Sequence, residues 1–308
     1  MQTKSIIMLA LSATASAHGV VTSITGANGV TMPGLSIADG TPRDCSSNGC
    51  GSQADTAIIR DREINSGQCG PLGRTQGNGP IKAETMIANF MGTGNAPTNN
   101  GQGVGVEDNI PANAQAAAAT GGNSRTNRNR NKARQLGNLL GGLLGGGRGG
   151  GGTKAETGPE SSVASSAGEG ASSGLPTASD SGKVTMTFRQ INQDGAGPMR
   201  ADIDATSGGT DASAFRPAQV TKDVPGFGIQ GLSLATSTEF PLEVQMPAGM
   251  TCEGTVAGVQ NVCVVRVRNG AGAGPFGGSA AFTQSAAARK RAIAYRLKKR
   301  MELNNRDE

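Results

Sequence analysis

The chain has few aromatic side chains and almost no histidine. It contains no Trp, one Tyr, seven Phe and a single His among 308 residues, while glycine occurs 49 times. Aromatic side chains bury the largest areas, so this composition leaves little with which to fill one large core. We therefore expect one modest folded domain together with low-complexity chain.

Long hydrophobic runs are absent beyond the first residues of the chain. The nearest, from Leu136 to Leu144, is interrupted by Gly141 and Gly142. It falls well short of the ~20 apolar residues that a helix needs to span a bilayer. No transmembrane segment is therefore expected.

The first residues predict a secretory signal peptide at 1–17. Lys4 gives the positive start, an apolar stretch follows, and Ala15-Ser16-Ala17 supplies the small residues of a cleavage site. We therefore expect a secreted, extracellular protein whose mature chain begins at His18. An N-terminal His offers its α-amino nitrogen and an imidazole nitrogen to one metal ion, and copper suits such ligands. His18 is thus a candidate metal ligand; the alternative is that it simply follows the cleavage site.

Five cysteines in an exported chain favour disulfides. Cys252 and Cys263 flank a predicted hairpin and are the first expected pair. Cys45, Cys50 and Cys69 then leave one thiol unpaired, and the sequence does not decide which one. The C-x₂-C spacing of a zinc site is absent, so a metal held by these cysteines is not expected.

Composition divides the chain after the signal peptide into four regions. Residues 18–94 and 183–285 alternate short apolar runs with Gly, Asn and Pro, which is typical of β-rich domains. Residues 95–182 are rich in Gly, Asn, Ala and Ser, with polybasic and glycine-rich patches, and predict a long disordered insertion. Residues 286–308 form a basic C-terminal tail with helical propensity.

The apolar patterns predict an all-β fold. Strands are expected at 20–24, 184–188, 239–246 and 262–268, where apolar residues recur with a period near two. No segment expected to be ordered shows a helical apolar stripe. Short strands separated by Gly and Pro turns favour an antiparallel β-sandwich of the immunoglobulin or fibronectin type. Its two halves would close around the insertion, since the entropy of closing a loop grows only slowly with loop length.

The positive charge lies in the segments that are expected to remain unfolded. Residues 121–152 carry +6 and the last twenty residues +5, so the net charge of +5 leaves about −6 elsewhere. The tail is interpreted as a solvated segment, with an anionic surface or a dibasic protease as alternative partners. A nucleic-acid partner is not expected behind a signal peptide.

Three segments together resemble a known family: the His18-Gly19-Val20-Val21 start, the run from Met186 to Pro198, and the run from Cys252 to Gly278. The motif residues within them are Gln190, Gly195, Gly197, Pro198, Gly274, Pro275, Phe276 and Gly277. In this order they resemble the secreted appressorium-specific virulence-factor family of plant- and insect-infecting fungi. The resemblance implies secretion during host penetration and a β-sandwich distantly similar to that of copper-dependent lytic polysaccharide monooxygenases.

The resemblance also implies a histidine where this chain has Arg189. A copper brace needs two imidazoles and the terminal amine, and a guanidinium offers no lone pair. A carboxylate such as Asp194 or Asp202 is the candidate replacement ligand, or else Asp194 is a turn residue of its Gly-rich loop. The two Gly-Pro motifs are interpreted as tight loops that need positive φ. Phe276 is interpreted as a plug for the open end of the sandwich, with an aromatic face presented at the rim as the alternative.

These observations favour a non-catalytic secreted effector or surface protein, acting at the host interface during penetration. Its expected partner is cell-wall polysaccharide or a host protein, and it is expected to be a monomer. The alternative is a copper-dependent polysaccharide monooxygenase-like enzyme, or a copper-binding protein, that uses His18. The sequence leaves open whether the protein is an enzyme. A serine hydrolase is not expected, because no G-x-S-x-G motif is present.

Overall fold

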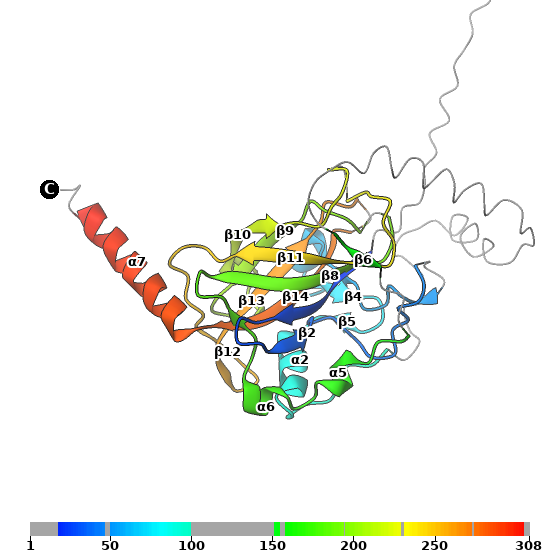
Figure 1. Cartoon of the computed structure of the whole chain (residues 1–308), viewed down its shortest axis with the longest axis horizontal. Coiled ribbons are helices and arrows are strands. Elements are labelled where there is room, and N and C mark those ends of the chain that lie inside the picture. The colour runs from blue at the N-terminus through cyan, green and yellow to red at the C-terminus, as the bar shows by residue number, and fades with distance from the viewer. Residues whose placement is uncertain are drawn as a thin grey trace, which may run out of the picture.

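The computed structural model describes residues 18–46, 50–99, 151–154, 158–193, 195–228, 231–272 and 274–304. The predicted signal peptide at 1–17, Asp194 and most of the predicted insertion at 95–182 lie outside the described residues. Strands that are almost all antiparallel form the body of the molecule, and short helices lie around it (Figure 1). The predicted all-β, antiparallel class is confirmed, while the immunoglobulin- or fibronectin-like sandwich stays a prediction.

The first sheet is built on strands with clear alternation. In order it contains β2 (Thr31–Pro33), β1 (Gly19–Thr25), β8 (Lys183–Gln190), β11 (Thr238–Gln245) and part of β10 (Phe215–Lys222), with β6 (Thr153–Lys154) paired to β11. Phe188 lies opposite Phe240 and Met186 opposite Leu242, and all four side chains are buried. The strands predicted from a period of two at 20–24, 184–188 and 239–246 are therefore present.

The second sheet continues from the first through β10. The first half of β10 pairs with β9 and its second half with β11, so the strand belongs to both sheets. Beyond it lie β9 (Arg200–Asp204), β13 (Val259–Arg268), β14 (Phe276–Gln284), β3 (Ala57–Ile58), β4 (Arg74–Thr75) and β5 (Gly79–Pro80). β12 (Gly254–Val256) pairs with β13, and β7 (Thr177–Ala178) pairs in parallel with β14.

Small residues in β14 compensate for the shortage of aromatic side chains. The strand is buried from Phe276 through Phe282, and the residues between them are only Gly, Ser and Ala. A side chain at Gly278 would place its Cβ 2.7 Å from the backbone nitrogen of Val21, so β1 lies directly against β14. β1 and β14 therefore pack closely together. This close packing lets a chain with few large side chains reach high packing density in its core.

The disulfides follow the expected pattern and show which of the five cysteines is unpaired. Cys252 and Cys263 are bonded across the β12–β13 hairpin, as predicted. Cys45 is bonded to Cys50, which leaves Cys69 as a free thiol that is buried.

Helix α2 (Ala83–Phe90) was not expected, although its sequence carries the signal. Ala83, Met86, Ile87 and Phe90 are buried and follow the i, i+3, i+4, i+7 spacing of an amphipathic helix. The expectation that no ordered segment has a helical stripe is therefore wrong. Further helical segments include α1 (Asp61–Asn65), the 3₁₀ helix η3 (Ala212–Ala214), and α7 (Ala286–Asn304) in the basic tail. Of the helices in the described ranges, none has the length and apolarity to cross a membrane.

Residues 158–182 pack against the body, although composition assigned them to the insertion. They contain α5 (Ser162–Ser165), α6 (Gly170–Ser173) and β7. Val163, Leu175 and Ala178 are buried in the main core. The predicted boundary at residue 182 is too late, because a few well-spaced apolar residues suffice to dock a Ser- and Gly-rich segment that composition alone classes as unfolded.

Leu175→Ala tests this packing. Leu175 is 2% exposed, so truncation leaves a cavity, and we expect the free energy of unfolding to fall by about 2–5 kcal/mol. The matched control is Leu234→Ala at a side chain that is 52% exposed, for which we expect less than about 0.5 kcal/mol. Urea denaturation measures both; equal effects would contradict docking of 158–182.

Candidate functional site

Parts of the three family-like segments meet at one end of the two sheets, which we call the motif end: His18, the loop 195–198 after β8, and the loop 274–276 between β13 and β14. His18 precedes β1, and its backbone N–H donates to Oδ1 of Asn192 at 2.7 Å, just beyond β8. The carbonyl of His18 accepts from the backbone N–H of Ile191 at 2.9 Å. The antiparallel register of β1 and β8 therefore brings the His-Gly start beside the loop that carries the first Gly-Pro motif.

The motif glycines allow close approach of neighbouring chain. A Cβ on Gly195 would lie 2.1 Å from the His18 carbonyl oxygen, and a Cβ on Gly197 would lie 2.2 Å from the carbonyl oxygen of Val224. In the second motif, a Cβ on Gly277 would lie 1.9 Å from the carbonyl oxygen of Val267. Gly197 and Gly277 do not adopt positive φ. The prediction that these loops need glycine for positive φ is therefore wrong at these two positions. Glycine is needed there because backbone packs onto Cα.

Asn269 joins the two Gly-Pro loops. Its Nδ2 donates to the carbonyl of Ala196 at 3.2 Å, and its Oδ1 accepts from the backbone N–H groups of Ala271 and Phe276, each at 3.1 Å. No role was expected for this buried residue. Asn269 directly follows a strongly predicted strand and precedes Gly274-Pro275. This position in the sequence could have indicated its structural role. Pro275, like Pro198 in the first motif, follows a cis peptide bond.

The His18 ring lies inside the motif end. It packs on the ring of Phe276 with centroids 4.5 Å apart, and both residues are buried. Phe276 therefore fills the end of the fold, as a plug would. Gln190 is also buried, and its Nε2 donates to Oγ of Ser233 and to the carbonyl of Ala235 at 2.9 Å. The motif residues thus contact one another and the segment 231–237.

The described residues do not fit a copper brace. His18 is the one imidazole of the chain, and no three His, Cys, Asp or Glu side chains of the described ranges are grouped so that they could hold a metal ion. Arg189 lies opposite Val20 in the β1–β8 register, and its guanidinium has no lone pair to offer. Asp194 is outside the described residues, so its role as a ligand stays a prediction, as does bound copper.

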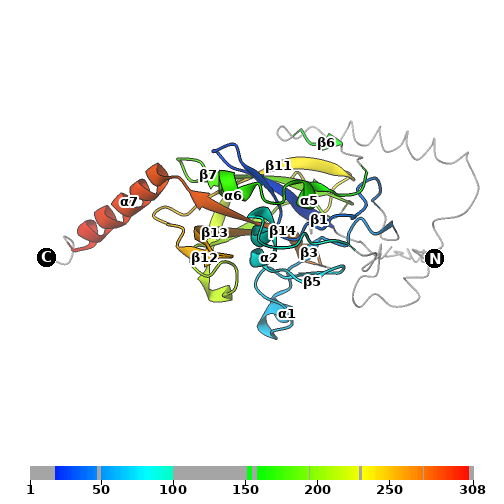
Figure 2. The same ribbon diagram turned by 90° about the horizontal axis from the view of Figure 1, so that it is seen from below.

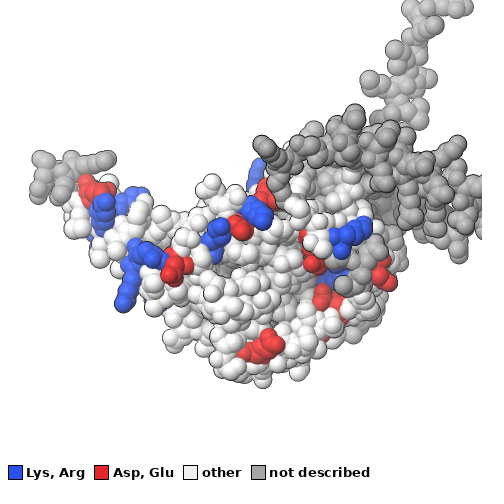
Figure 3. Space-filling model, viewed as in Figure 1, with Lys and Arg blue, Asp and Glu red and all other residues white. Residues whose placement is uncertain are grey.

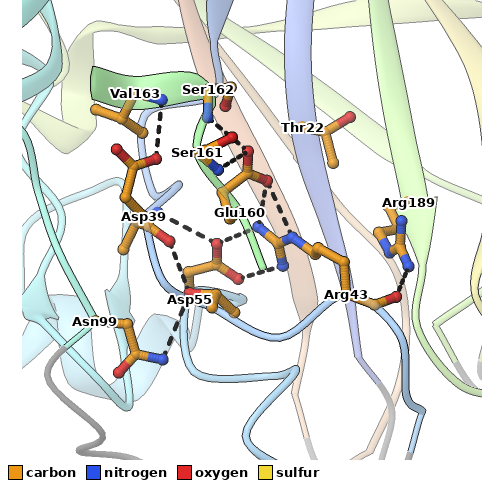
Figure 4. Close-up of polar contacts among 12 residues, drawn as sticks. Thr22, Asp39, Arg43, Asp55, Asn99, Glu160, Ser161, Ser162, Val163 and Arg189 are labelled. Atoms are coloured by element: carbon orange, nitrogen blue, oxygen red, sulfur yellow. Dashed lines mark hydrogen bonds and ion pairs between the residues drawn. The ribbon is translucent and has the colours of Figure 1, made fainter. Parts of the chain in front are cut away.

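Arg189 belongs instead to a cluster of buried charges beside the motif end. Its guanidinium donates to the carbonyl of Arg43 (Figure 4). It also lies 3.5 Å from Oε1 of Glu239. The Arg43 guanidinium is bonded through Nη1 to Asp55 at 3.0 Å and through Nε to Glu160 at 3.0 Å. We call these five residues the arginine cluster; four of them, all but Asp55, line a hollow of about 460 Å³.

Opposite charges outweigh burial for Arg43 and Glu160 in the arginine cluster. Burial disfavours the charged form of Arg43, yet Asp55 and Glu160 raise the pKa of its guanidinium above the ordinary value. Burial likewise disfavours ionised Glu160, yet Arg43 and hydrogen bonds from Ser162 hold the pKa of this carboxyl below its usual range. Burial, together with the nearby Arg43 charge, lowers the pKa of Arg189. A guanidinium nevertheless remains a cation at neutral pH.

The loop that carries Arg43 also binds the chain on both sides of residues 100–150. Asp39 accepts a backbone hydrogen bond from Asn99, and its carboxylate accepts from the N–H groups of Val163 and Ala164 at the start of α5 (Figure 4). Glu160 exchanges backbone hydrogen bonds with Gly40 and Thr41. The loop that carries Arg43 therefore holds both flanking segments close to each other.

Asp55→Asn tests the contribution of the buried ion pair. Asp55 is fully buried against Arg43, so loss of its carboxylate leaves part of a buried charge unpaired. We therefore expect the free energy of unfolding to fall by about 3–5 kcal/mol. Asp61→Asn is the matched control, because Asp61 pairs with Arg268 but its side chain is 69% exposed. For that change we expect less than about 1 kcal/mol. Similar losses for the two variants would contradict the cluster's role.

Glu160→Gln tests the pH dependence. Because the folded-state pKa of Glu160 is below its ordinary value of 4.5, the ion pair stabilises the protein above that pH, and the stabilisation is lost as pH falls through the folded value. We expect the variant to be less stable at neutral pH and to lose less stability between about pH 5 and pH 3 than the unchanged chain. Thermal unfolding across this range measures both; Glu169→Gln, at an exposed side chain of the same segment, is the control. Parallel curves for the unchanged chain and Glu160→Gln would contradict the assignment.

Comparison with known proteins agrees with the sequence resemblance. Residues 16–277 match the family described as Egh16-like virulence factor. The chain is 51% identical over 303 residues to the appressoria-specific virulence factor GAS2 of Pyricularia oryzae, which covers 97% of this chain and 94% of that protein. It is 39% identical over 131 residues to GAS1 of the same fungus, covering 41% of this chain and 51% of GAS1. No solved structure matches, so the likeness to copper-dependent monooxygenases stays a prediction. The family match spans His18 and both Gly-Pro motifs, and the chain belongs to the Egh16-like virulence factor family.

Proposed function

We propose that the protein is a secreted, virulence-associated protein that acts at the host interface by binding, without catalysis. Membership of a virulence-factor family supports the role in virulence, and the names of the relatives support action by the appressorium. The signal-peptide pattern at 1–17 and two disulfides support secretion, because disulfides persist in oxidising compartments.

Arg189 carries the argument against catalysis. The family resemblance implies a second metal-binding histidine at this position. Here a guanidinium stands in its place, donating to Arg43 and paired with Glu239. The packing of His18 on Phe276 supports a structural role for the remaining imidazole.

Two exposed side chains support binding at the motif end. Phe227 and Leu234 are each 52% exposed and lie on the segment 223–237. This segment is fastened to the first Gly-Pro motif, since the backbone N–H of Ala196 donates to Gly231 at 2.7 Å. One ring and one aliphatic side chain suit an apolar patch on a protein better than the face of a sugar chain, which favours a host protein as the partner. Cell-wall polysaccharide is the alternative partner.

His18→Phe separates binding from metal chemistry. Phenylalanine keeps a ring against Phe276 but removes both imidazole nitrogens. In a Pyricularia oryzae strain that lacks GAS2 and is restored by the unchanged chain, we expect this variant to restore leaf lesions equally well. Phe227→Ser combined with Leu234→Ser keeps His18 and is expected to restore fewer lesions. A folded, secreted His18→Phe variant that restores none would overturn the proposal and favour the copper alternative.

Purified protein with His18 as its first residue provides the direct control. Calorimetric titration is expected to show copper affinity no higher than that of a short peptide beginning with His-Gly. Tighter binding, together with reductant-dependent release of oxidised oligosaccharides, would contradict a non-catalytic role. Retention on chitin, cellulose or pectin that is lost in the Phe227→Ser, Leu234→Ser variant would identify polysaccharide as the partner.

A further inference from the structure

Helix α7 combines positive charge with exposed apolar side chains. Between Ala286 and Asn304 it carries seven Lys or Arg residues and one Glu. Most of the large hydrophobic side chains that are exposed in the described ranges belong to it: Ile293, Tyr295, Leu297, Met301 and Leu303. Figures 1 and 2 both show α7 extending away from the sheets, and Figure 3 shows Lys and Arg along it. A concentration of apolar side chains on an exposed element indicates an interaction surface.

One side of α7 faces the body of the protein. Arg291 lies 3.8 Å from Asp180, and Arg296 lies 3.9 Å from Glu253. Tyr295 lines the hollows between the helix and the strands. These contacts set the rotation of the helix about its axis and use two of its cations.

The opposite side, which we call the outer face, carries Ile293, Leu297 and Met301. Residues four apart lie on one side of a helix, whereas Tyr295 is two residues from Ile293 and Leu297 and points the other way. Lys290 is seven residues before Leu297 and joins the outer face. Arg300 is seven residues after Ile293 and lies at the border of this face, since it also lines the hollow beside Glu253. Neither Lys290 nor Arg300 forms an ion pair with any described residue.

We propose that the outer face of α7 docks on the surface of an anionic phospholipid bilayer. The stripe of Ile293, Leu297 and Met301 enters the boundary between headgroups and acyl chains, and Lys290 and Arg300 bind the anionic headgroups. A bilayer surface is the partner that matches both properties of the face. An acidic polysaccharide would satisfy the cations but leave the apolar stripe in water.

Docking through α7 would leave the motif end accessible. β14 begins at Phe276, within the motif end, and ends at Gln284, immediately before α7. Likewise, β8 starts near Asp180, the partner of Arg291, and ends at Gln190. The helix and the motif end therefore lie at opposite ends of the same strands. This inference does not rest on the proposed function, since it uses no residue of the motif end.

Co-sedimentation of the full secreted chain with lipid vesicles tests the proposal. We expect binding to phosphatidylcholine vesicles that contain phosphatidylserine, little binding to phosphatidylcholine alone, and weaker binding as salt is raised. Leu297→Ser is expected to weaken binding about tenfold, because one leucine no longer enters the interface. Leu303→Ser is the matched control: it is 53% exposed beside 54% for Leu297, but it lies toward the body, so binding should be unchanged.

A second pair of variants tests the charges. Lys290→Gln with Arg300→Gln is expected to weaken binding about tenfold and to reduce its salt dependence. Lys82→Gln with Lys222→Gln removes the same charge from exposed positions on the body and should have little effect. Circular dichroism confirms that each variant is folded. Failure of the unchanged chain to bind phosphatidylserine vesicles, equal binding by Leu297→Ser and Leu303→Ser, or retention on polygalacturonate in place of vesicles would each overturn the proposal.

Discussion

A single buried cation, Arg43, fixes how three distant parts of the chain come together. A guanidinium removed from water is stable only when carboxylates surround it, and here Asp55 and Glu160 supply them from opposite sides of residues 100–150. Their pairing places Glu160 next to the loop that carries Arg43, and the following residues then enter α5 with Val163 buried. The docking of a Ser- and Gly-rich segment therefore involves an ion pair in addition to its few apolar side chains.

The same cation explains what Arg189 does. Consecutive residues of a strand point to opposite faces of the sheet, so Arg189 and Gln190 serve different structures. Arg189 turns toward Arg43 and Glu239, whereas Gln190 binds Ser233 and Ala235 at the motif end. With two cations and three carboxylates, the arginine cluster carries one net negative charge. A guanidinium is suited to this position because it can pair with Glu239 and donate to a carbonyl at once.

The sequence predicted those parts of the fold that local patterns control. Alternation located β8, β11 and β13, and the Cys252–Cys263 hairpin followed from two strands and a short turn. The stripe of α2 was present in the sequence and was missed, because eight residues in a Gly-rich context give a short pattern. The partners of Arg43 could not be found in this way, since Asp55 and Glu160 become neighbours only through folding. Asn269 is a similar case, because its role depends on a loop far away in sequence.

The motif glycines compensate for the shortage of large side chains in the sequence. With few aromatic residues, the core closes because β1 and β13 approach β14 at Gly277 and Gly278, where any side chain would collide with backbone. Gly195 admits the His18 carbonyl in the same manner. The residues that carry the family resemblance therefore mainly satisfy packing requirements within the fold. Surfaces available to a partner must then be sought outside them, on segments such as 223–237 and α7, where apolar side chains remain exposed.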